Sequence, residues 1–231
     1  MDESGRLTPV AAGQAVVKAV SQADESVFDA CQVTVNEAQS EPEPEPEPEP
    51  GPVGKAQKQT ISAKSLTKVL GDKAFPLKAK AKTGLSYESS DKKVVQIDKK
   101  GNVTIKGVGK AKITIQAQKT EKFQAAKKTV TITVNPKGTA LKKVSGGKKK
   151  VDVTWNRNGA VDGYQLQYAK DKAFKKGRKT VSIGKNSTVK TTVKKLKGKQ
   201  KYFFRIRTFK KVGKTTYYSK WSGSKSTTAK K

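Results

Sequence analysis

The sequence predicts an all-β protein built from tandem β-sandwiches that are joined by linkers. Three observations lead to this prediction. Apolar residues alternate with polar ones in many short runs rich in β-branched residues, such as Val130–Val134, and no comparable run has helical spacing. Glycine-containing turns separate these runs, and part of the pattern occurs twice. A chain of 231 residues is long enough for two domains of about 100 residues each.

A tract of five Glu-Pro pairs occupies residues 41–50. Proline at every second position fixes φ and removes half of the backbone donors, so this tract cannot enter a core. We expect an extended polyproline-II rod, stiffened by repulsion between the carboxylates and about 30 Å long. Residues 37–58 are therefore predicted to form a Glu-Pro-rich linker between folded modules.

Charge is distributed unevenly along the chain. The formal net charge is +31, but residues 1–50 hold eleven acids and two bases, which leaves eight acids and forty-eight bases for residues 51–231. Only five of the fifty bases are arginine. Because bidentate recognition of bases or phosphates favours arginine, a lysine-rich surface indicates diffuse, salt-sensitive attraction to polyanions, without specific nucleic-acid recognition. We expect most of the lysines simply to keep sheet faces and edges soluble.

An internal repeat places a partial module ahead of the tract. Residues 2–8 match residues 98–104 at a shift of 96, and Val33–Val35 match Ile132–Val134 at a shift of 99. Residues 1–36 are therefore predicted to be the C-terminal half of the module that residues 59–136 contain in full. Half a sandwich cannot close a two-sheet core alone. The chain is a fragment, its start is misplaced, or this half is only partly ordered; we favour a fragment.

The complete module is expected to contain strands at 75–81, 103–106, 111–117 and 130–134, with turns at Gly101-Asn102 and at residues 107–109. The string 85–91, 94–98, 101–104 and 107–111 resembles the bacterial immunoglobulin-like (Ig-like) domains of group 2, although Val95 stands where that family has alanine. The family occurs on exported and surface proteins, including those of Gram-positive bacteria. The resemblance implies a non-catalytic spacer or adhesive module.

Residues 141–231 form a second strand series, with expected strands at 151–155, 164–168, 181–183, 188–193, 202–209 and from 217 onward. The series resembles a fibronectin type III domain. The residues that carry the resemblance are Trp155, Gly163–Tyr168, Leu196 six residues before Tyr202 in a tyrosine-corner arrangement, and Trp221-Ser222.

Alternation within this second series separates two faces. It predicts that Trp155, Tyr202, Phe204 and Ile206 lie in the core. Phe203, Arg205 and Arg207 are expected on the opposite face, where arginine packed on the edge of phenylalanine is ordinary surface packing.

The composition argues against catalysis. The chain has no histidine, which removes the usual general base and the commonest metal ligand. We therefore predict no catalytic residue, no metal site and no cofactor. Asp91 and Asp98 are interpreted as turn residues rather than a glycosidase pair. Cys31, the one cysteine, shares a face with Val33 and Val35 and is predicted to be a buried structural thiol.

The resemblances imply a secreted or cell-surface protein that acts as a spacer or adhesive region. The expected partners are anionic cell-wall polymers or host glycans and proteins, and we expect a monomer without specific nucleic-acid binding. The predicted contact residues are Lys210, Lys211, Lys214 and Tyr218. A basic loop tip suits phosphate or sulfate polymers, and an exposed tyrosine near Trp221 suits stacking on a sugar. The alternative is an accessory C-terminal region of an exported hydrolase whose catalytic domain lies upstream. No stretch of the chain is apolar enough to span a bilayer, and residues 1–20 do not read as a signal peptide, so any signal or anchor would lie outside this chain.

Overall fold

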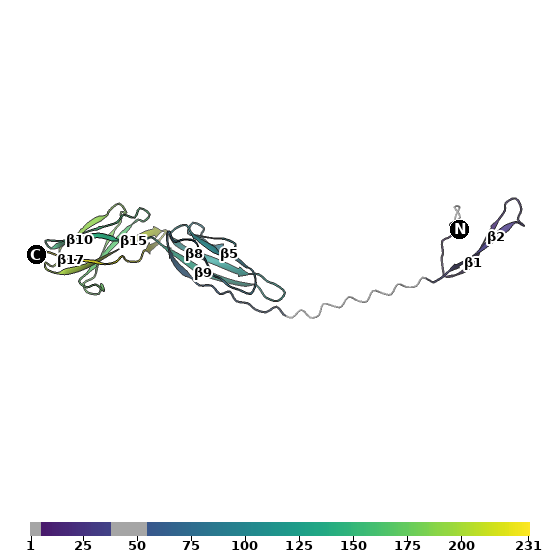
Figure 1. Ribbon diagram of the computed structural model, residues 1–231, viewed down its shortest axis with the longest axis horizontal. Coiled ribbons are helices and arrows are strands. Elements are labelled where there is room, and N and C mark those ends of the chain that lie inside the picture. The colour runs from purple at the N-terminus through teal and green to yellow at the C-terminus, as the bar shows by residue number, and fades with distance from the viewer. Residues whose placement is uncertain (1–5, 38–54) are drawn as a thin grey trace. The chain divides into compact units, whose positions relative to one another are not determined.

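The computed structural model describes residues 6–37 and 55–231, so the Glu-Pro tract and the rod predicted there lie outside the described residues. The chain divides into two compact units, Met1–Val53 and Gly54–Lys231. The described part of the first unit is a hairpin, and the second unit contains two sandwiches, which we call the middle and the C-terminal sandwich (Figure 1). The described residues contain no helix, which confirms the all-β prediction.

The hairpin consists of β1 (Gly13–Val20) and β2 (Phe28–Val35), which pair antiparallel along their whole length. Asp24 closes the turn between them, because its carboxylate accepts the backbone N–H of Ser26 at 2.9 Å. The same carboxylate accepts the hydroxyl of Ser26, and these hydrogen bonds lower the pKa of Asp24.

Cys31 is exposed in this hairpin, so the prediction of a buried thiol was wrong. The alternation itself was correct, because Val33 and Val35 on the same face are the more covered residues of β2. Burial needs a second layer, however, and the described part of this unit supplies only two strands. An apolar face without a covering sheet remains open to water.

The middle sandwich has two sheets. One has the strand order β3-β9-β8-β5 and the other has the order β4-β7-β6. The strands are β3 (Leu66–Val69), β4 (Phe75–Pro76), β5 (Leu85–Ser89), β6 (Val95–Ile97), β7 (Asn102–Ile105), β8 (Gly109–Ala117) and β9 (Ala126–Asn135). The inward-facing residues of β8 and β9 alternate with outward-facing ones and form most of the core with Val95 and Val103.

The strand expected at residues 75–81 is interrupted. Only Phe75 and Pro76 pair with β7, whereas Lys80 pairs with Ser62. Lys78 between them adopts a left-handed backbone conformation with φ of 56°. The alternating pattern predicts one strand, but the chain turns at Lys78 and pairs with a different segment on each side of the turn. The missed strand β3 is short and pairs in parallel with β9 at the sheet edge.

The C-terminal sandwich packs a three-stranded sheet, ordered β10-β11-β14, with a five-stranded sheet. In the second sheet the order is β13-β12-β15-β16, and β17 also pairs with β15. The strands are β10 (Leu141–Gly147), β11 (Lys150–Trp155), β12 (Gly163–Ala169), β13 (Lys179–Ile183), β14 (Lys190–Val193), β15 (Lys201–Val212), β16 (Thr215–Tyr218) and β17 (Lys225–Thr228).

The predicted core of this sandwich is confirmed. Trp155, Phe204 and Ile206 are fully buried and Tyr202 is nearly so. The hydroxyl of Tyr202 accepts the backbone N–H of Lys197 at 3.1 Å. This bond is the tyrosine corner that the spacing between Leu196 and Tyr202 predicted.

The last strands differ from the expectation. Residues 217–221 do not begin the final strand, because β16 ends at Tyr218 and residues 219–224 run along β15 without strand pairing. The final strand is β17, which pairs with the beginning of β15. Strand β10, which the alternation did not reveal, carries two glycines in its second half.

Candidate functional site

The outer face of β15 carries a connected group of arginine, glutamine and aromatic side chains. Residues with even numbers from Tyr202 to Ile206 face the core, so Phe203, Arg205 and Arg207 face outward, as predicted. The burial pattern of β15 therefore turns the charged side chains away from the core.

Each of the two arginines lies between aromatic rings. The guanidinium carbon of Arg205 is 4.1 Å from the ring centre of Phe174 and 4.7 Å from that of Trp221. The guanidinium carbon of Arg207 is 4.4 Å from the ring centre of Trp221 and 3.9 Å from that of Tyr218. We call these five residues the arginine–aromatic stack. Contacts of this kind add electrostatic attraction between the cation and the ring to ordinary packing.

Two glutamines of β12 hold the guanidinium groups by hydrogen bonds. The strand register places Gln167 opposite Arg205 and Gln165 opposite Arg207. The Nε and Nη2 groups of each arginine donate to the Oε1 atom of the glutamine opposite, with Nε–Oε1 distances of 2.9 Å in both pairs. Each glutamine amide then donates to a hydroxyl of β13, Thr180 or Ser182.

Trp221 is held by the serines on either side of it. The hydroxyl of Ser222 accepts the N–H of Ile206 at 3.0 Å, and the N–H of Ser222 donates to the carbonyl of Ile206 at 2.8 Å. Ser219 repeats this exchange with Thr208. The segment that carries Trp221 is therefore fastened along β15 by side-chain and backbone bonds in place of a strand ladder.

Phe174 reaches the stack from the loop between β12 and β13. Its φ of 58° lies in the left-handed region, which is strained for an aromatic residue. The carboxylate of Asp171 accepts the backbone N–H groups of Lys175 and Lys176, and these bonds lower the pKa of Asp171. The loop is thus closed around Phe174, which is buried.

The two arginines carry charge that no carboxylate of residues 6–37 or 55–231 compensates. Within the described residues, the single ion pair closer than 4.0 Å joins Lys210 to Asp162. Burial lowers the pKa of Arg205, and the nearby positive charges of Arg178 and Arg207 lower it further. Burial also lowers the pKa of Arg207. Three of the five arginines in the chain therefore contribute positive potential to one sheet face.

The structure divides the predicted contact residues into two groups. Lys210 and Lys211 belong to β15 itself rather than to a loop, and Lys214 lies in the turn before β16. Lys210 is 2.9 Å from the carboxylate of Asp162, which also accepts the N–H of Lys211. That backbone bond is the main cause of the lowered pKa of Asp162. Tyr218, by contrast, belongs to the arginine–aromatic stack.

Sequence reasoning placed Arg205 and Arg207 on the correct face but treated their packing as ordinary. It missed their joint contact with Trp221 and the part played by Phe174. One signal was available, because Gln165 and Gln167 alternate on β12 in the same way as the two arginines on β15.

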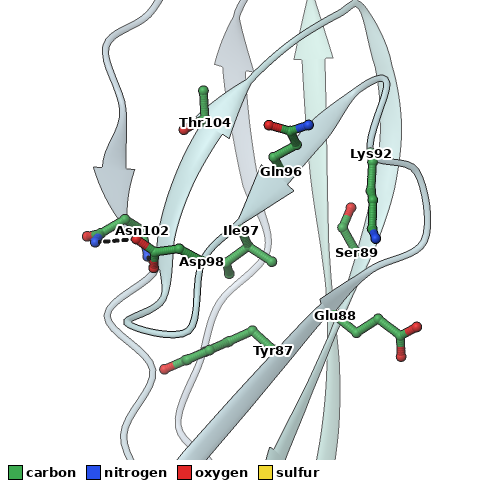
Figure 2. Close-up of a pocket in the computed structure, with 9 residues that line it drawn as sticks. All are labelled: Tyr87, Glu88, Ser89, Lys92, Gln96, Ile97, Asp98, Asn102 and Thr104. Atoms are coloured by element: carbon green, nitrogen blue, oxygen red, sulfur yellow. Dashed lines mark hydrogen bonds between the residues drawn. The ribbon is translucent and has the colours of Figure 1, made fainter.

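A hollow of about 450 Å³ lies at the open edge of the middle sandwich, between β5 and the strands β6 and β7 (Figure 2). Its lining includes Glu88 and Asp98. Asp98 stabilises a turn, because its carboxylate accepts N–H groups of Lys100 and Asn102. The hydrogen bonds from Asn102 lower the pKa of Asp98. Asp91 likewise accepts the backbone N–H of Lys93. Turn chemistry therefore accounts for both aspartates, as the sequence indicated.

No group of three or more His, Cys, Asp or Glu side chains in the described ranges is arranged to hold a metal ion. The same residues include no helix long and apolar enough to cross a membrane.

Comparison with known domain families agrees with these two folds. Residues 135–224 match the model of the fibronectin type III domain, and residues 75–119 match that of the intimin immunoglobulin-like domain. The chain contains a bacterial Ig-like domain followed by a fibronectin type III domain. The middle sandwich is the Ig-like domain, and the arginine–aromatic stack lies on the fibronectin type III domain. Both families are usually non-catalytic and are typical of extracellular or surface proteins.

The solved structures that match this chain have low sequence identity to it. A redesigned β-sandwich protein is 20% identical, with 40% of this chain and 93% of that chain covered and a TM-score of 0.32. The FN1-FN3 domains of chicken CNTN1 are 14% identical, with 76% and 65% covered and a TM-score of 0.34. A β-1,2-glucanase from Parabacteroides distasonis is 11% identical, with 58% and 18% covered and a TM-score of 0.35. No curated protein matches the chain.

Proposed function

We propose that this protein is a non-catalytic spacer and adhesive region of a secreted or cell-surface protein, and that it binds polymers carrying phosphate or sulfate groups. The two domain assignments support the modular, non-catalytic part. The outer face of the fibronectin type III domain supports the binding part. The observation that carries it is a pair of adjacent, partly buried arginines that have no carboxylate partner in the part of the chain that the structure describes.

Burial of a cation usually requires a compensating anion. Arg205 and Arg207 are half-buried, and their pKa values are lowered by burial, which means that their charged forms are less stable than in water. The neutral amides of Gln165 and Gln167 orient the guanidinium groups but do not neutralise them. A bound phosphate or sulfate would supply the missing negative charge.

The geometry leaves donors for such an anion. The Nε and Nη2 atoms of both arginines are used by the glutamines, whereas no acceptor among the described residues bonds to either Nη1 atom. Because aromatic rings cover the flat faces of the guanidinium groups, the groups are held in place before a ligand arrives. Preorganised planar donors suit tetrahedral oxyanions better than mobile lysines do.

The surrounding lysines would add long-range attraction. Residues 51–231 carry forty-eight bases and eight acids, so a polyanion is drawn to the whole surface. This diffuse attraction falls steeply with salt. The arginine site should instead persist at ionic strengths that screen the lysines, and this difference makes the two contributions separable.

The test is retention of the full chain on heparin and on a phosphate-backbone wall polymer, eluted with increasing salt. We expect Arg205→Lys combined with Arg207→Lys to elute at clearly lower salt than the parent chain, although the net charge is unchanged. Arg157→Lys is the matched control, because Arg157 is exposed and lies outside the stack. Circular dichroism confirms that each variant keeps its fold.

A second variant tests the basic turn. Lys211→Gln combined with Lys214→Gln removes two charges from the β15–β16 hairpin and should shift elution less than the arginine pair. Equal elution of the arginine variant and the parent would overturn the arginine site, and no retention of the parent at low salt would overturn the adhesive function as a whole.

A further inference from the structure

The N-terminal hairpin reproduces one hairpin of the Ig-like domain in register as well as in sequence. In β1 and β2 the partners are Gly13 with Val35, Ala15 with Val33, and Val17 with Cys31. In β8 and β9 the equivalent partners are Gly109 with Val134, Ala111 with Ile132, and Ile113 with Val130. The first glycine has the same unusual φ in both, 153° in Gly13 and 152° in Gly109. The repeat therefore extends to backbone geometry.

The Ig-like domain shows what covers this face in a complete module. Each inward residue of β8 and β9 that has a counterpart in the hairpin is at most 3% exposed; these residues are Ala111, Ile113, Val130, Ile132 and Val134. They pack against Ile61, Leu77, Val95 and Val103. The residues that cover this face thus belong largely to the first half of the module. The apolar face of a β8–β9 hairpin is therefore buried only when that first half is present.

The same face of the hairpin is open. We define the hairpin face as Ala15, Val17, Cys31, Val33 and Val35. Cys31 is exposed, although its counterpart Val130 is buried. A hollow of about 490 Å³ lies on this face, lined in part by Leu7, Val17, Val33 and Val35.

The segment before β1 also lacks the neighbours that its counterpart has in the Ig-like domain. Leu7 is the counterpart of Val103, yet Leu7 is 44% exposed and Val103 is fully buried. Residues 6–10 form no strand, whereas their counterpart β7 pairs with β4 and β6. Neither of those partners has an equivalent within residues 6–37. A strand without neighbours has no ladder to stabilise it.

We propose that the hairpin face is the docking surface for an Ig-like first half-module, a polypeptide with the chemistry of residues 57–97. This inference is independent of the proposed anion binding. The sequence of the connecting turn supports this occupant. Asp98 and Gly101 close the turn that joins the two half-modules in the Ig-like domain, where Gly101 has a φ of 81°. Asp2 and Gly5 repeat both residues at the same spacing.

The opposite face of the hairpin is not the docking surface. It carries Val16, Val20 and Phe28, which are exposed, and the ammonium group of Lys18 lies 3.4 Å from the ring centre of Phe28. The counterparts of Val16, Val20 and Phe28 in the Ig-like domain are Lys112, Gln116 and Lys127, which face solvent. A complete module therefore leaves this side uncovered.

Cys31 provides a direct test, because it is the one thiol of the chain and lies in the hairpin face. The rate of its reaction with an aromatic disulfide reagent is measured in the full chain and in a chain with residues 55–97 inserted ahead of Asp2. Completing the module should slow the reaction by at least about 100-fold, since a buried thiol reacts only through local opening. Cys31→Ser combined with Val130→Cys calibrates the rate of a thiol at the equivalent buried position.

A matched control carries the same insertion with its copy of Val95 replaced by Asp. This chain has the same length but a charged group where the cover must be apolar, so its Cys31 should react as fast as in the parent. A separate polypeptide of residues 55–97, added to the full chain, provides the same measurement without the fusion.

Two results would overturn the proposal. One is a Cys31 that stays as reactive as in the parent after both the insertion and the added polypeptide. The other is a parent chain whose Cys31 becomes protected as concentration rises, with a doubled mass by light scattering. That second result would identify another copy of the chain as the occupant.

Discussion

At the scale of single residues, Arg205 and Arg207 show what the alternation of apolar and polar residues can predict and what it cannot. Alternation along β15 correctly turned both side chains outward. Their partners Phe174, Tyr218 and Trp221 belong to a loop, a neighbouring strand and an unpaired segment. The spacing of residues within one strand contains no information about contacts with other segments. The outward position of the two arginines could therefore be predicted, but their contacts with the aromatic rings could not.

Asp162 should make stability depend on acid pH. Its pKa is lowered, chiefly by the Lys211 N–H, so its contribution is present above the ordinary value of 3.8 and is lost as pH falls through the lowered pKa. Because the carboxylate is partly exposed, we expect Asp162→Asn to cost only about 0.5 kcal/mol at pH 7. Urea unfolding at about pH 7 and about pH 2 measures the cost, which should vanish in acid. Lys210→Met should cost less, since it leaves the backbone bond intact, and a cost of Asp162→Asn that is equal at both pH values would contradict the assignment.

Gly163 occupies a position with no room for a side chain. A Cβ atom there would overlap the carbonyl oxygen of Ile183 and press on the ring of Phe209. We expect Gly163→Ala to destabilise the fibronectin type III domain by about 2–3 kcal/mol, the usual cost of overpacking. Gly184→Ala is the control, because nothing lies within 4 Å of its added Cβ. Denaturant midpoints of the two variants should differ clearly, and similar midpoints would refute the steric argument.

At the scale of elements, the tyrosine corner is a feature that the sequence predicted, and it rests on one hydrogen bond between Lys197 and Tyr202. Tyr202→Phe keeps the ring, which packs edge-on against Tyr168, but removes the acceptor of the Lys197 N–H. We expect a loss of about 1 kcal/mol in unfolding free energy. Tyr217→Phe serves as the comparison, since no other described residue hydrogen-bonds the Tyr217 hydroxyl. Chemical denaturation checks both variants, and equal effects would count against a special role for the corner.

The elements that sequence reasoning misjudged share a physical cause. Residues 75–81 alternate well, yet Lys78 turns the chain and the pairing moves from β7 to Ser62. Residues 219–224 follow two tyrosines typical of strands, yet serine hydroxyls replace the ladder there. In both segments the pairing partner is distant in sequence, and alternation reports only how side chains divide between two faces.

At the scale of the whole molecule, ion pairs among the described residues compensate little of the positive charge. One ion pair is present in the described residues, against forty-eight bases after residue 50. Self-repulsion should therefore destabilise the folded state at low ionic strength. The lysine surface was predictable from composition, whereas the scarcity of pairs required the structure.

Salt should consequently stabilise the protein. We expect the midpoint of thermal unfolding to rise by about 4 °C or more between about 0.01 M and 0.3 M NaCl, because screening weakens repulsion between lysines. Differential scanning calorimetry measures the change, and a neutral osmolyte at matched osmolality is the control. A midpoint that is independent of salt would show that the lysines are too far apart to repel.

The sequence by itself determined the all-β class, the order of the modules, the repeated hairpin and the core of β15. These features depend on local alternation and on matches along the chain, which need no knowledge of distant contacts. Tertiary structure alone decided that Cys31 is exposed and that Lys210 is paired with Asp162. It also brought Trp221 between two arginines. Each of these outcomes depends on which segments come into contact in the folded chain. Those contacts are decided by the paths of the loops and by whether a second sheet covers a face. Neither produces a periodic pattern of apolar residues in the sequence.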